Sequence, residues 1–252
     1  MAADTGPIGG NLSHEFIILA DTGESKIYTD KRIFDVDSSK TILNKESLGV
    51  LRKQYEKFYS VTDEKFNKDE FEKSVAEEYR VNTKGIEVGH IFYFGDKYSK
   101  PMNAAVDFNG KKEFVKMGSY GIGVSRLVGA IIEAKYNDKD GIMKWPMSVT
   151  PYDCAIIPMI NKNDKSNLEK SIKIYEFLKS KNIETIIDDT DENISAKIKK
   201  FNLIGIPYQL IIGSKSEGNL YEFKEVDGET QKLKVEDIAS QIIKAKQNWF
   251  HN

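Results

Sequence analysis

The chain has one cysteine, three histidines and four arginines among its 252 residues, and each scarcity excludes a class of chemistry. Cys154 cannot form an internal disulfide, and its place in the apolar run DCAIIP is typical of a small core residue. A reducing cytoplasm is therefore the expected compartment. None of the histidines has the second histidine or cysteine three or four residues away that a zinc site on one element needs.

Long apolar runs are also missing. No segment approaches the roughly 18 uninterrupted apolar residues of a membrane helix, and the N-terminal MAADTGPIGG lacks the basic and apolar regions of a secretion signal. Lys plus Arg (37) nearly balance Asp plus Glu (39), which gives a net charge of −2. We therefore expect no membrane partner. A globally cationic nucleic-acid binder is excluded, whereas a local basic patch is not.

The residues that are present predict a folded protein, because 40% of them are hydrophobic and 11% aromatic. In the first half we expect a strand over 15–20, an amphipathic helix over 47–59 and a solvated helical stretch over 63–80. A strand at HIFYFG, a hairpin with Asn109-Gly110 at its tip and the turn GSYGIG then lead into a helix with an apolar stripe. Two or three strands alone rarely bury enough surface, so we expect the segment over 1–29 to be the edge of a larger sheet.

After a linker over 137–150, anchored by Trp145, strands alternate with helices. This pattern favours parallel strand pairing with right-handed crossovers, and we expect a compact α/β domain of about 100 residues. The expected strands are 154–158, 184–188 and 208–213, the expected helices are 165–181 and 194–202, and a hairpin through Asp227-Gly228 and a helix over 235–246 follow.

The segment GSYGIGVSR is a candidate anion site. Gly118, Gly121 and Gly123 would let the backbone approach a ligand, and free amides at the start of the next helix would donate to an anion. Arg126 adds a planar fork suited to phosphate oxygens. The segment matches neither a Walker loop nor the dinucleotide fingerprint, and a purely structural tight turn is the alternative interpretation.

Four motifs occur together in one order: DTGPIGGNLSHEF, GIEVGHIFYFGDKYSKPMNA, MGSYGIGVSRLVGAIIE and LIGIPYQLIIG. In this combination the chain resembles the bacterial-type prolyl-tRNA synthetases, a family of class II aminoacyl-tRNA synthetases. The resemblance implies an α+β fold. It places the C-terminal part of a class II catalytic domain, with an antiparallel sheet, at 1–30 and 85–145, a truncated insertion at 31–84, and an α/β anticodon-binding domain at 150–252.

The resemblance also implies a reaction: the family activates proline with ATP and Mg²⁺, releases pyrophosphate and transfers the prolyl group to tRNA(Pro). Arg126 would hold the terminal phosphate of ATP beside Gly118, Gly121 and Gly123. The proline pocket would be lined by His14, His90, Ser119 and Gly121. No metal held by a protein motif is expected. Because no covalent enzyme intermediate is needed, catalysis would depend on positioning and on neutralising charge, which agrees with the lack of a legible nucleophile.

The short interval between residues 16 and 85 resembles the truncated insertion of some bacterial members. Shape alone discriminates against smaller amino acids by only about 1 to 3 kcal/mol per methylene, so many members add an editing domain there. We therefore expect no hydrolysis of mischarged alanyl-tRNA, which deacylation by the purified protein would contradict.

In the α/β domain, Lys197, Lys199 and Lys200 are the predicted tRNA contacts, although they are equally consistent with the solvated face of a short helix. Asn193 stands where the family usually carries an arginine, and the domain has no arginine at all. Lysine is a point charge, so these residues would hold phosphates but would read a base edge less selectively.

Family members extend well upstream of ADTGPIGG. That upstream part carries the first class motif, which is a dimer element of the intact homodimer, and the second motif, whose arginine binds the α-phosphate. The expectation is thus the C-terminal part of such a ligase, inactive without its N-terminal half. The alternatives are a non-catalytic tRNA-binding module and a small-nucleotide binder that uses only GSYGIG and Arg126.

Overall fold

The structure is a computed structural model that describes residues 1–10, 12–38, 44–161, 165–213, 216 and 218–250. The chain divides into two compact units, Met1–Ala134 and Lys135–Asn252, and each is described by itself. Among the described residues, no helix combines the length and the apolar character that crossing a bilayer requires.

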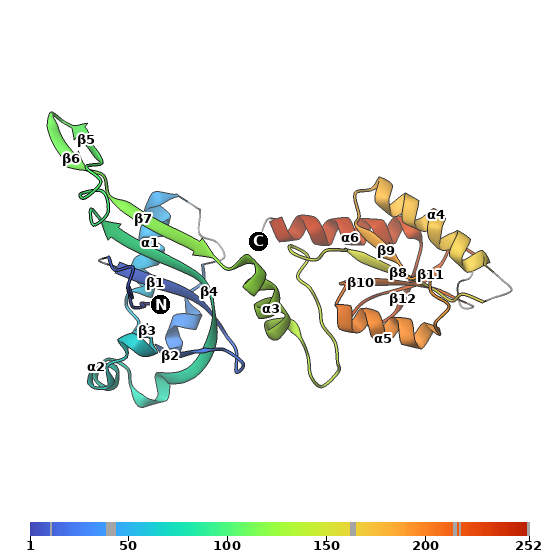
Figure 1. The fold of residues 1–252 in the computed structure, drawn as a ribbon. Helices are drawn as coiled ribbons and strands as arrows, with labels where there is room; N and C mark the ends of the chain where they lie inside the picture. The colour runs from blue at the N-terminus through green and yellow to red at the C-terminus, as the bar shows by residue number, and fades with distance from the viewer. Residues whose placement is uncertain (11, 39–43, 162–164, 214–215, 217, 251–252) are drawn as a thin grey trace. The chain divides into compact units, whose positions relative to one another are not determined.

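Unit 1 is built around one long strand, β4, in an antiparallel sheet (Figure 1). Gly85 of β4 pairs with both β1 and β2, and Gly89 pairs with both β1 and β7. A strand has two edges, so β1 occupies one edge of β4 while β2 and β7 share the other. The strands are β1 (Leu12–Leu19), β2 (Ser25–Asp30), β3 (Ser60–Thr62), β4 (Arg80–Gly95) and β7 (Met117–Ile122).

The segment GSYGIG is a strand rather than the expected turn. Ser119 to Gly121 lie in β7 and pair with Phe92 to His90 of β4, which satisfies the backbone groups of that edge. The helix α3 (Val124–Lys135) begins only after Gly123. Its predicted apolar stripe is present, but Val124 and Val128 are exposed.

The stretch 63–80 is not one helix. It forms η2 (Asp63–Lys65), α2 (Lys68–Ser74) and η3 (Glu77–Tyr79). After α2 the backbone is extended at Val75, and the guanidinium of Arg80 donates to the carbonyls of Val75 and Glu72 at this helix end. The preceding segment contains η1 (Lys31–Asp35) and α1 (Lys45–Tyr55), the latter close to the predicted helix.

The predicted insertion shares the sheet of unit 1. Strand β4 runs without a break across residues 84 and 85, and β3 pairs with β2. Rings from both parts also pack together: Tyr28 of β2 stacks on Phe66 with centroids 3.6 Å apart, and Phe71 meets both rings edge-on. Aromatic packing therefore fixes this segment to the sheet.

The predicted hairpin is confirmed as β5 (Ala105–Phe108) and β6 (Lys111–Phe114). Asn109 and Gly110 both have positive φ, 54° and 74°, as the central residues of a type I′ turn require. The two strands form a sheet of their own.

Unit 2 is the predicted α/β layer structure. Its sheet has the order β12-β11-β10-β8-β9, in which β8, β9 and β10 are parallel. Alternate residues of β8 enter two cores, one under α4 and α6 and the other under α5. The elements are β8 (Cys154–Pro158), α4 (Ser166–Ser180), β9 (Thr185–Ile187), α5 (Ile194–Ile204), β10 (Tyr208–Ile212), β11 (Tyr221–Glu225), β12 (Gln231–Leu233) and α6 (Val235–Phe250).

The linker residues before β8 pack on the end of α5. The backbone amide of Trp145 donates to the carbonyl of Gly205, and its indole Nε1 donates to the carbonyl of Ile204, both at 2.9 Å. Trp145 thus anchors this segment, as its composition predicts, and the segment belongs to unit 2.

Candidate functional site

One face of the unit 1 sheet gathers polar side chains from β1, β4 and β7. His90 pairs across the strands with Glu15 on one side and Gly121 on the other, and Phe92 pairs likewise with Ser13 and Ser119. Cross-strand partners, and residues two apart along one strand, project to the same face. The structure therefore brings the predicted residues His90, Ser119 and Gly121 together.

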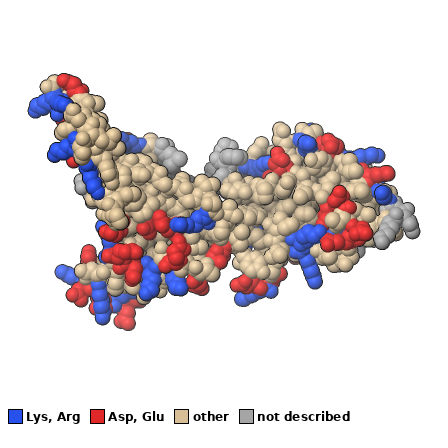
Figure 2. Space-filling view, in the orientation of Figure 1, with Lys and Arg blue, Asp and Glu red and all other residues tan. Residues whose placement is uncertain are grey.

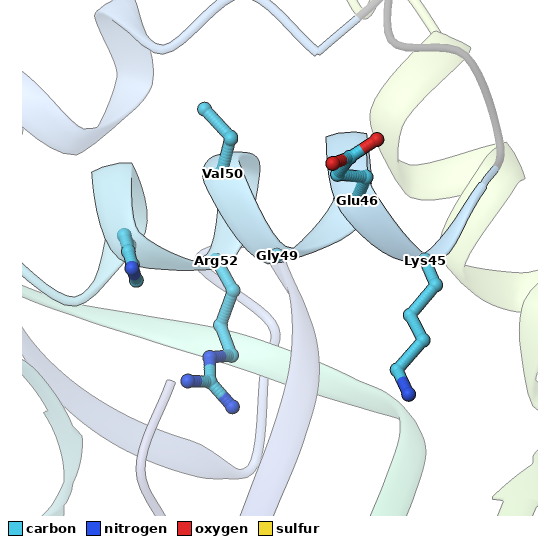
Figure 3. Close-up of a pocket in the computed structure, with 6 residues that line it drawn as sticks. Lys45, Glu46, Gly49, Val50 and Arg52 are labelled. Atoms are coloured by element: carbon cyan, nitrogen blue, oxygen red, sulfur yellow. The ribbon is translucent and has the colours of Figure 1, made fainter.

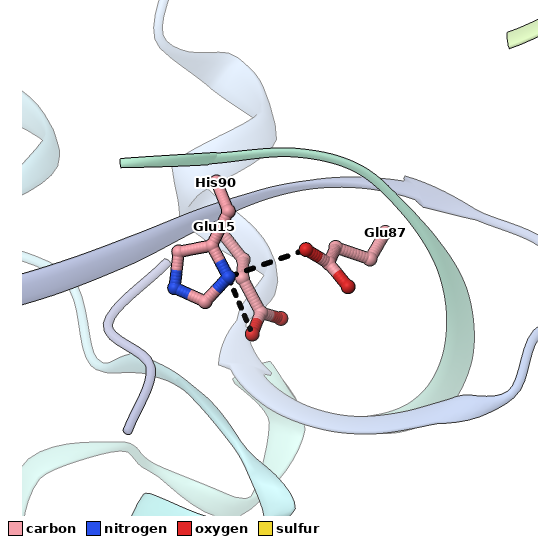
Figure 4. A group of neighbouring side chains, drawn as sticks. All are labelled: Glu15, Glu87 and His90. Carbon is pink, nitrogen blue, oxygen red and sulfur yellow. Dashed lines mark hydrogen bonds and ion pairs between the residues drawn. The ribbon is translucent and has the colours of Figure 1, made fainter. Parts of the chain in front are cut away.

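The imidazole of His90 lies at the centre of this face (Figure 4). Its Nε2 is 2.5 Å from Oγ of Ser13, and its Nδ1 is 3.2 Å from Oε1 of Glu87 and 3.6 Å from Oε1 of Glu15. The ring stacks on Phe92 with centroids 3.9 Å apart. Both ring nitrogens are thus oriented by neighbouring side chains.

The two carboxylates give this face negative charge. The side chain of Glu15 is only 15% exposed, and burial, followed by repulsion from Glu87, raises the pKa of Glu15. A bound cation would relieve that repulsion. Glu15, Glu87 and His90 each offer a ligand atom within 4.8 Å of the others, and the carboxylate oxygens suit Mg²⁺ better than the imidazole does. Sequence reasoning missed both glutamates, because only the pairing of β1 with β4 places them together.

An open cavity of about 380 Å³ lies beside His90 and Phe92 and is lined on its other side by the loop 4–8. The loop is held in place: Gly6 donates its amide to Oδ2 of Asp4, and the carbonyl of Ile8 accepts hydrogen bonds from Nζ of Lys97 and the hydroxyl of Tyr98. Pro7, Ile8 and Phe92 give the cavity apolar walls beside the charged group. The arrangement suits a small molecule with one apolar and one cationic part.

Arg126 lies near this face but is not free. Its Nη1 donates to the carbonyl of Glu87 at 2.7 Å, and it forms ion pairs with Oε2 of Glu87 at 3.4 Å and with Oε1 of Glu24 at 3.8 Å. The side chain is half-exposed. Arg126 is therefore connected to His90 through Glu87, and an anion would have to compete with two carboxylates for the guanidinium.

The glycines of this segment have different roles. Gly121 lies on the site face and pairs with His90. A Cβ at Gly118 would lie 3.0 Å from the carbonyl oxygen of Phe92, a tight contact, so glycine at this position eases the close approach of β7 to β4. The amide of Gly123 donates to the carbonyl of Val88 and is thus already used.

His14 does not join the site. It pairs with Ile91, so it projects from the face opposite His90. Burial, followed by the charges of the N-terminus and Lys65, lowers the pKa of His14. The two imidazoles therefore do not bound one cleft. The residues flanking a histidine cannot indicate which face of a sheet it occupies.

The three predicted tRNA-binding lysines differ in the structure. Lys197 is fully buried, so the expectation that it contacts a phosphate is corrected; its Nζ donates to the carbonyls of Pro158, Asp188 and Thr190. Lys200 forms ion pairs with Asp188 and Glu192 at 3.0 and 2.6 Å.

Lys199 is exposed and, among the residues that the structure describes, has no polar partner. Asn193, at the position where the family usually has an arginine, caps α5: its side-chain oxygen accepts the amide of Ala196 at 2.9 Å. Of the predicted tRNA contacts, only Lys199 therefore presents a free charge.

A second depression, of about 560 Å³, lies along α1 (Figure 3). Its lining comes from one helix, and Val50 points away from the direction in which Lys45 and Arg52 extend. No side chains converge there, so it offers no chemistry comparable with the face around His90.

Comparisons with known proteins show which proteins this chain is similar to. Residues 153–245 match the family model described as an anticodon binding domain. The chain is 69% identical over 247 residues to a proline-tRNA ligase of Pelagibacter ubique (strain HTCC1062), a match that covers 98% of this chain and 56% of that protein.

A proline-tRNA ligase of Bartonella quintana (strain Toulouse) is 45% identical over 250 residues, with 97% of this chain and 56% of that protein covered. One of Hyphomonas neptunium (strain ATCC 15444) is 44% identical over 246 residues, with 96% and 55% covered. The chain spans just over half the length of these relatives, and over that part it is similar to proline-tRNA ligases.

Proposed function

We propose that this chain supplies the proline pocket and one phosphate-binding arginine of a proline-tRNA ligase, and that it works with the part of the ligase that it does not span. One observation carries the proposal. In a chain 69% identical to such a ligase, the sheet of unit 1 sets Glu15, Glu87 and His90 beside a small apolar cavity.

The pocket suits the chemistry of proline. The pyrrolidine ring is small and apolar, and its secondary amine is protonated at neutral pH, so two carboxylates beside Phe92 and Pro7 would bind both parts of the molecule. His90, held by Ser13, would orient the bound amino acid with Ser119 and Gly121 on the same face. His14 is left out of this pocket because it projects from the opposite face.

Arg126 is proposed to hold the terminal phosphate of ATP. In the reaction, an oxygen of the proline carboxylate attacks the α-phosphorus, the bond to the bridging oxygen breaks, and pyrophosphate leaves as prolyl-adenylate forms. Mg²⁺ bound to the nucleotide neutralises phosphate charge when it is present. Arg126 would give up its ion pairs with Glu87 and Glu24 for the phosphate and would stabilise the charge that develops on the leaving group.

The need for a completing part is supported by exposed apolar surface. Tyr120 and Ile122 of β7 and Val124 of α3 are 80%, 72% and 74% exposed. Within the described ranges, the outer edge of β7 pairs with no other strand. A patch of this kind next to a free sheet edge is typical of a surface that another segment covers. In the proposed ligase, another segment would complete the class II catalytic sheet, and the complete ligase would form a homodimer. Unit 2 would be the anticodon-binding domain for the tRNA(Pro) substrate.

The test is proline-dependent exchange of pyrophosphate into ATP. This chain is mixed with the segment of the Pelagibacter relative that it does not match, and exchange is expected only in the mixture. Arg126→Ala and Glu87→Gln should each abolish exchange, whereas Lys26→Gln, on an exposed strand position, should leave it unchanged. If the mixture binds tRNA but never exchanges pyrophosphate while the intact relative does, the chain is a non-catalytic tRNA-binding module instead.

A further inference from the structure

We propose that the hairpin β5–β6 of unit 1 is a contact site for the acceptor end of the tRNA, with lysines holding its backbone and Phe108 stacking on an unpaired base. This inference rests on the proposed function only in taking tRNA as the substrate. It assigns an RNA-binding surface outside the anticodon-binding domain.

The hairpin is unsupported by the rest of the unit. Strands β5 and β6 pair only with each other, and residues 106–113 are exposed on both faces. An isolated two-stranded hairpin is at best marginally stable in water. Nevertheless Val106 and Phe108 are 51% and 59% exposed, and Met102 at its base is 71% exposed. Apolar side chains kept on such an extension indicate a surface that something covers.

The charge of this segment indicates what covers it. The whole chain has a net charge of −2. In contrast, residues 96–117 contain five lysines, two aspartates and one glutamate, which gives this segment a net charge of +2. Lys116 is paired with Asp96, and Lys97 is bound to the carbonyl of Ile8. The other three lysines of this segment lie on the hairpin and at its base: Lys100, Lys111 and Lys112.

These three charges are available to a partner. Lys111 has no polar partner among the described residues, Lys100 has only the nearby charge of Asp96, which Lys116 already pairs, and Lys112 reaches only the side-chain oxygen of Asn103, at 3.3 Å. Figure 2 shows basic side chains along the extension that β5 and β6 form in Figure 1. Lysine is depleted from the cores of protein interfaces, whereas lysine beside exposed aromatic rings is the usual composition of surfaces that bind RNA.

The register places the ring and a charge together. Phe108 pairs directly with Lys111 across the Asn109-Gly110 turn, so both project to one face at the tip. A base could stack on Phe108 while Lys111 contacts the adjoining phosphate. Asp107 is engaged within the turn, where its Oδ1 accepts the amide of Gly110, so its charge is partly compensated locally.

The base of the hairpin connects to the proposed proline pocket. Tyr98 packs edge-on against Phe94 with centroids 5.0 Å apart, and its hydroxyl donates to the carbonyl of Ile8 in the loop that lines the cavity. The root is also closed by backbone hydrogen bonds from Ala104 to Ser99 and from Val115 to Ala104. An RNA that runs along the hairpin to its base would therefore lead to the pocket, and the part of a tRNA that must come there is its acceptor end.

The experiment measures binding of the full chain to an unmodified tRNA(Pro) transcript and to a minihelix of its acceptor stem with the single-stranded 3′ end. The triple variant Lys100→Gln, Lys111→Gln, Lys112→Gln should weaken minihelix binding and lower the slope of log affinity against log salt by about 2. Phe108→Ala should weaken it roughly 5- to 100-fold with little change of slope.

The matched control is the triple variant Lys26→Gln, Lys73→Gln, Lys84→Gln, which removes three exposed lysines of unit 1 elsewhere. It should bind the minihelix as the unchanged chain does. All substituted side chains are exposed, so unchanged thermal unfolding verifies folding in every variant.

Three outcomes overturn the inference. If the unchanged chain binds both RNAs and the hairpin variants bind the minihelix equally well, the hairpin assignment is wrong while the proposed function stands. If the hairpin variants alter only self-association, measured by sedimentation, the hairpin is an interface between copies of the chain. If the unchanged chain binds neither RNA, the tRNA substrate of the proposed function fails together with the hairpin contact.

Discussion

At the scale of single residues, Lys197 shows how a charge can serve the fold alone. Its ammonium has no exposure to solvent and bonds to carbonyls at the ends of β8 and β9 and in the following loop. Asp188, almost equally buried, lies 3.6 Å away. A buried cation is tolerated only when its hydrogen-bonding capacity is met and an opposite charge is near, and both conditions hold here.

Lys197→Met should therefore destabilise unit 2 by about 3 to 5 kcal/mol, because it removes one partner of a buried ion pair and leaves three carbonyls without a donor. Lys199→Met, on the exposed side of the same helix, should change stability by less than about 0.5 kcal/mol. Urea unfolding of both variants provides the measurement. Equal unfolding midpoints would contradict the role assigned to Lys197.

The carboxyl of Glu15 makes stability depend on pH. Burial and the charge of Glu87 raise its pKa above the ordinary 4.5, so the fold disfavours its ionised form relative to the unfolded chain. The favourable contribution is complete below the unfolded pKa and is lost as pH rises through the folded pKa.

Glu15→Gln should accordingly stabilise the chain above that raised pKa and give no gain near pH 4. The measurement is the free energy of unfolding between about pH 4 and pH 8, with the exposed Glu113→Gln as control. A loss of stability that is the same at every pH would show that packing, and not charge, decides the effect of Glu15.

At the scale of elements, the end of α5 depends on one glycine. Gly205 caps the helix with φ of +85°, and a Cβ there would lie 2.5 Å from Cγ and 3.0 Å from Cβ of Met143. The same residue accepts the amide of Trp145, so the helix end, the linker and the turn into β10 are built together.

Gly205→Ala is expected to destabilise unit 2 by at least about 1 to 2 kcal/mol, the cost of a left-handed alanine, with the clash against Met143 in addition. Gly129→Ala offers the opposite case: it lies within α3 with open space around its Cβ position. That change should stabilise unit 1 by up to about 1 kcal/mol. Thermal unfolding of the two variants tests whether stability falls in the first and rises in the second. If Gly129→Ala lowers stability, α3 is not helical at that position.

The periodicity of the sequence predicts some features of the helix α3 but not others. Its spacing correctly indicates a helix with an apolar stripe and Arg126 outside it. The pattern cannot show what the stripe packs against, and in this chain Val124, Val128 and Ile132 remain exposed. A hydrophobic pattern specifies a face to be buried, whereas the partner is a property of the complete assembly.

At the scale of the whole molecule, the two units have separate sheets and separate cores, so they are expected to unfold in two transitions. Unit 1 has much exposed apolar surface and an open sheet edge, and we assign it the lower transition temperature. Ile27→Ala should lower only the transition temperature of unit 1, and Ile156→Ala only that of unit 2. Each substitution should reduce the free energy of unfolding of its unit by about 2 to 5 kcal/mol, because both side chains are fully buried.

Differential scanning calorimetry distinguishes these cases. Adding the completing segment of the relative should raise the first transition and leave the second unchanged. A single transition that shifts with either substitution would show that the units unfold as one.

The sequence by itself determined the elements that local physics controls. The alternation of strands and helices predicted the layers of unit 2, and Asn109-Gly110 predicted the turn of the hairpin. The ordered motifs indicated a resemblance to the prolyl-tRNA synthetases. Only the tertiary structure decided the site. The pairing of β1 with β4 places Glu15 beside His90, and the alternation of side chains along β1 places His14 on the opposite face. Lys197, predicted to contact RNA, is buried and stabilises the interior of unit 2. Spacing along a chain fixes which local face a residue occupies, but cross-strand register and burial depend on segments far apart in sequence.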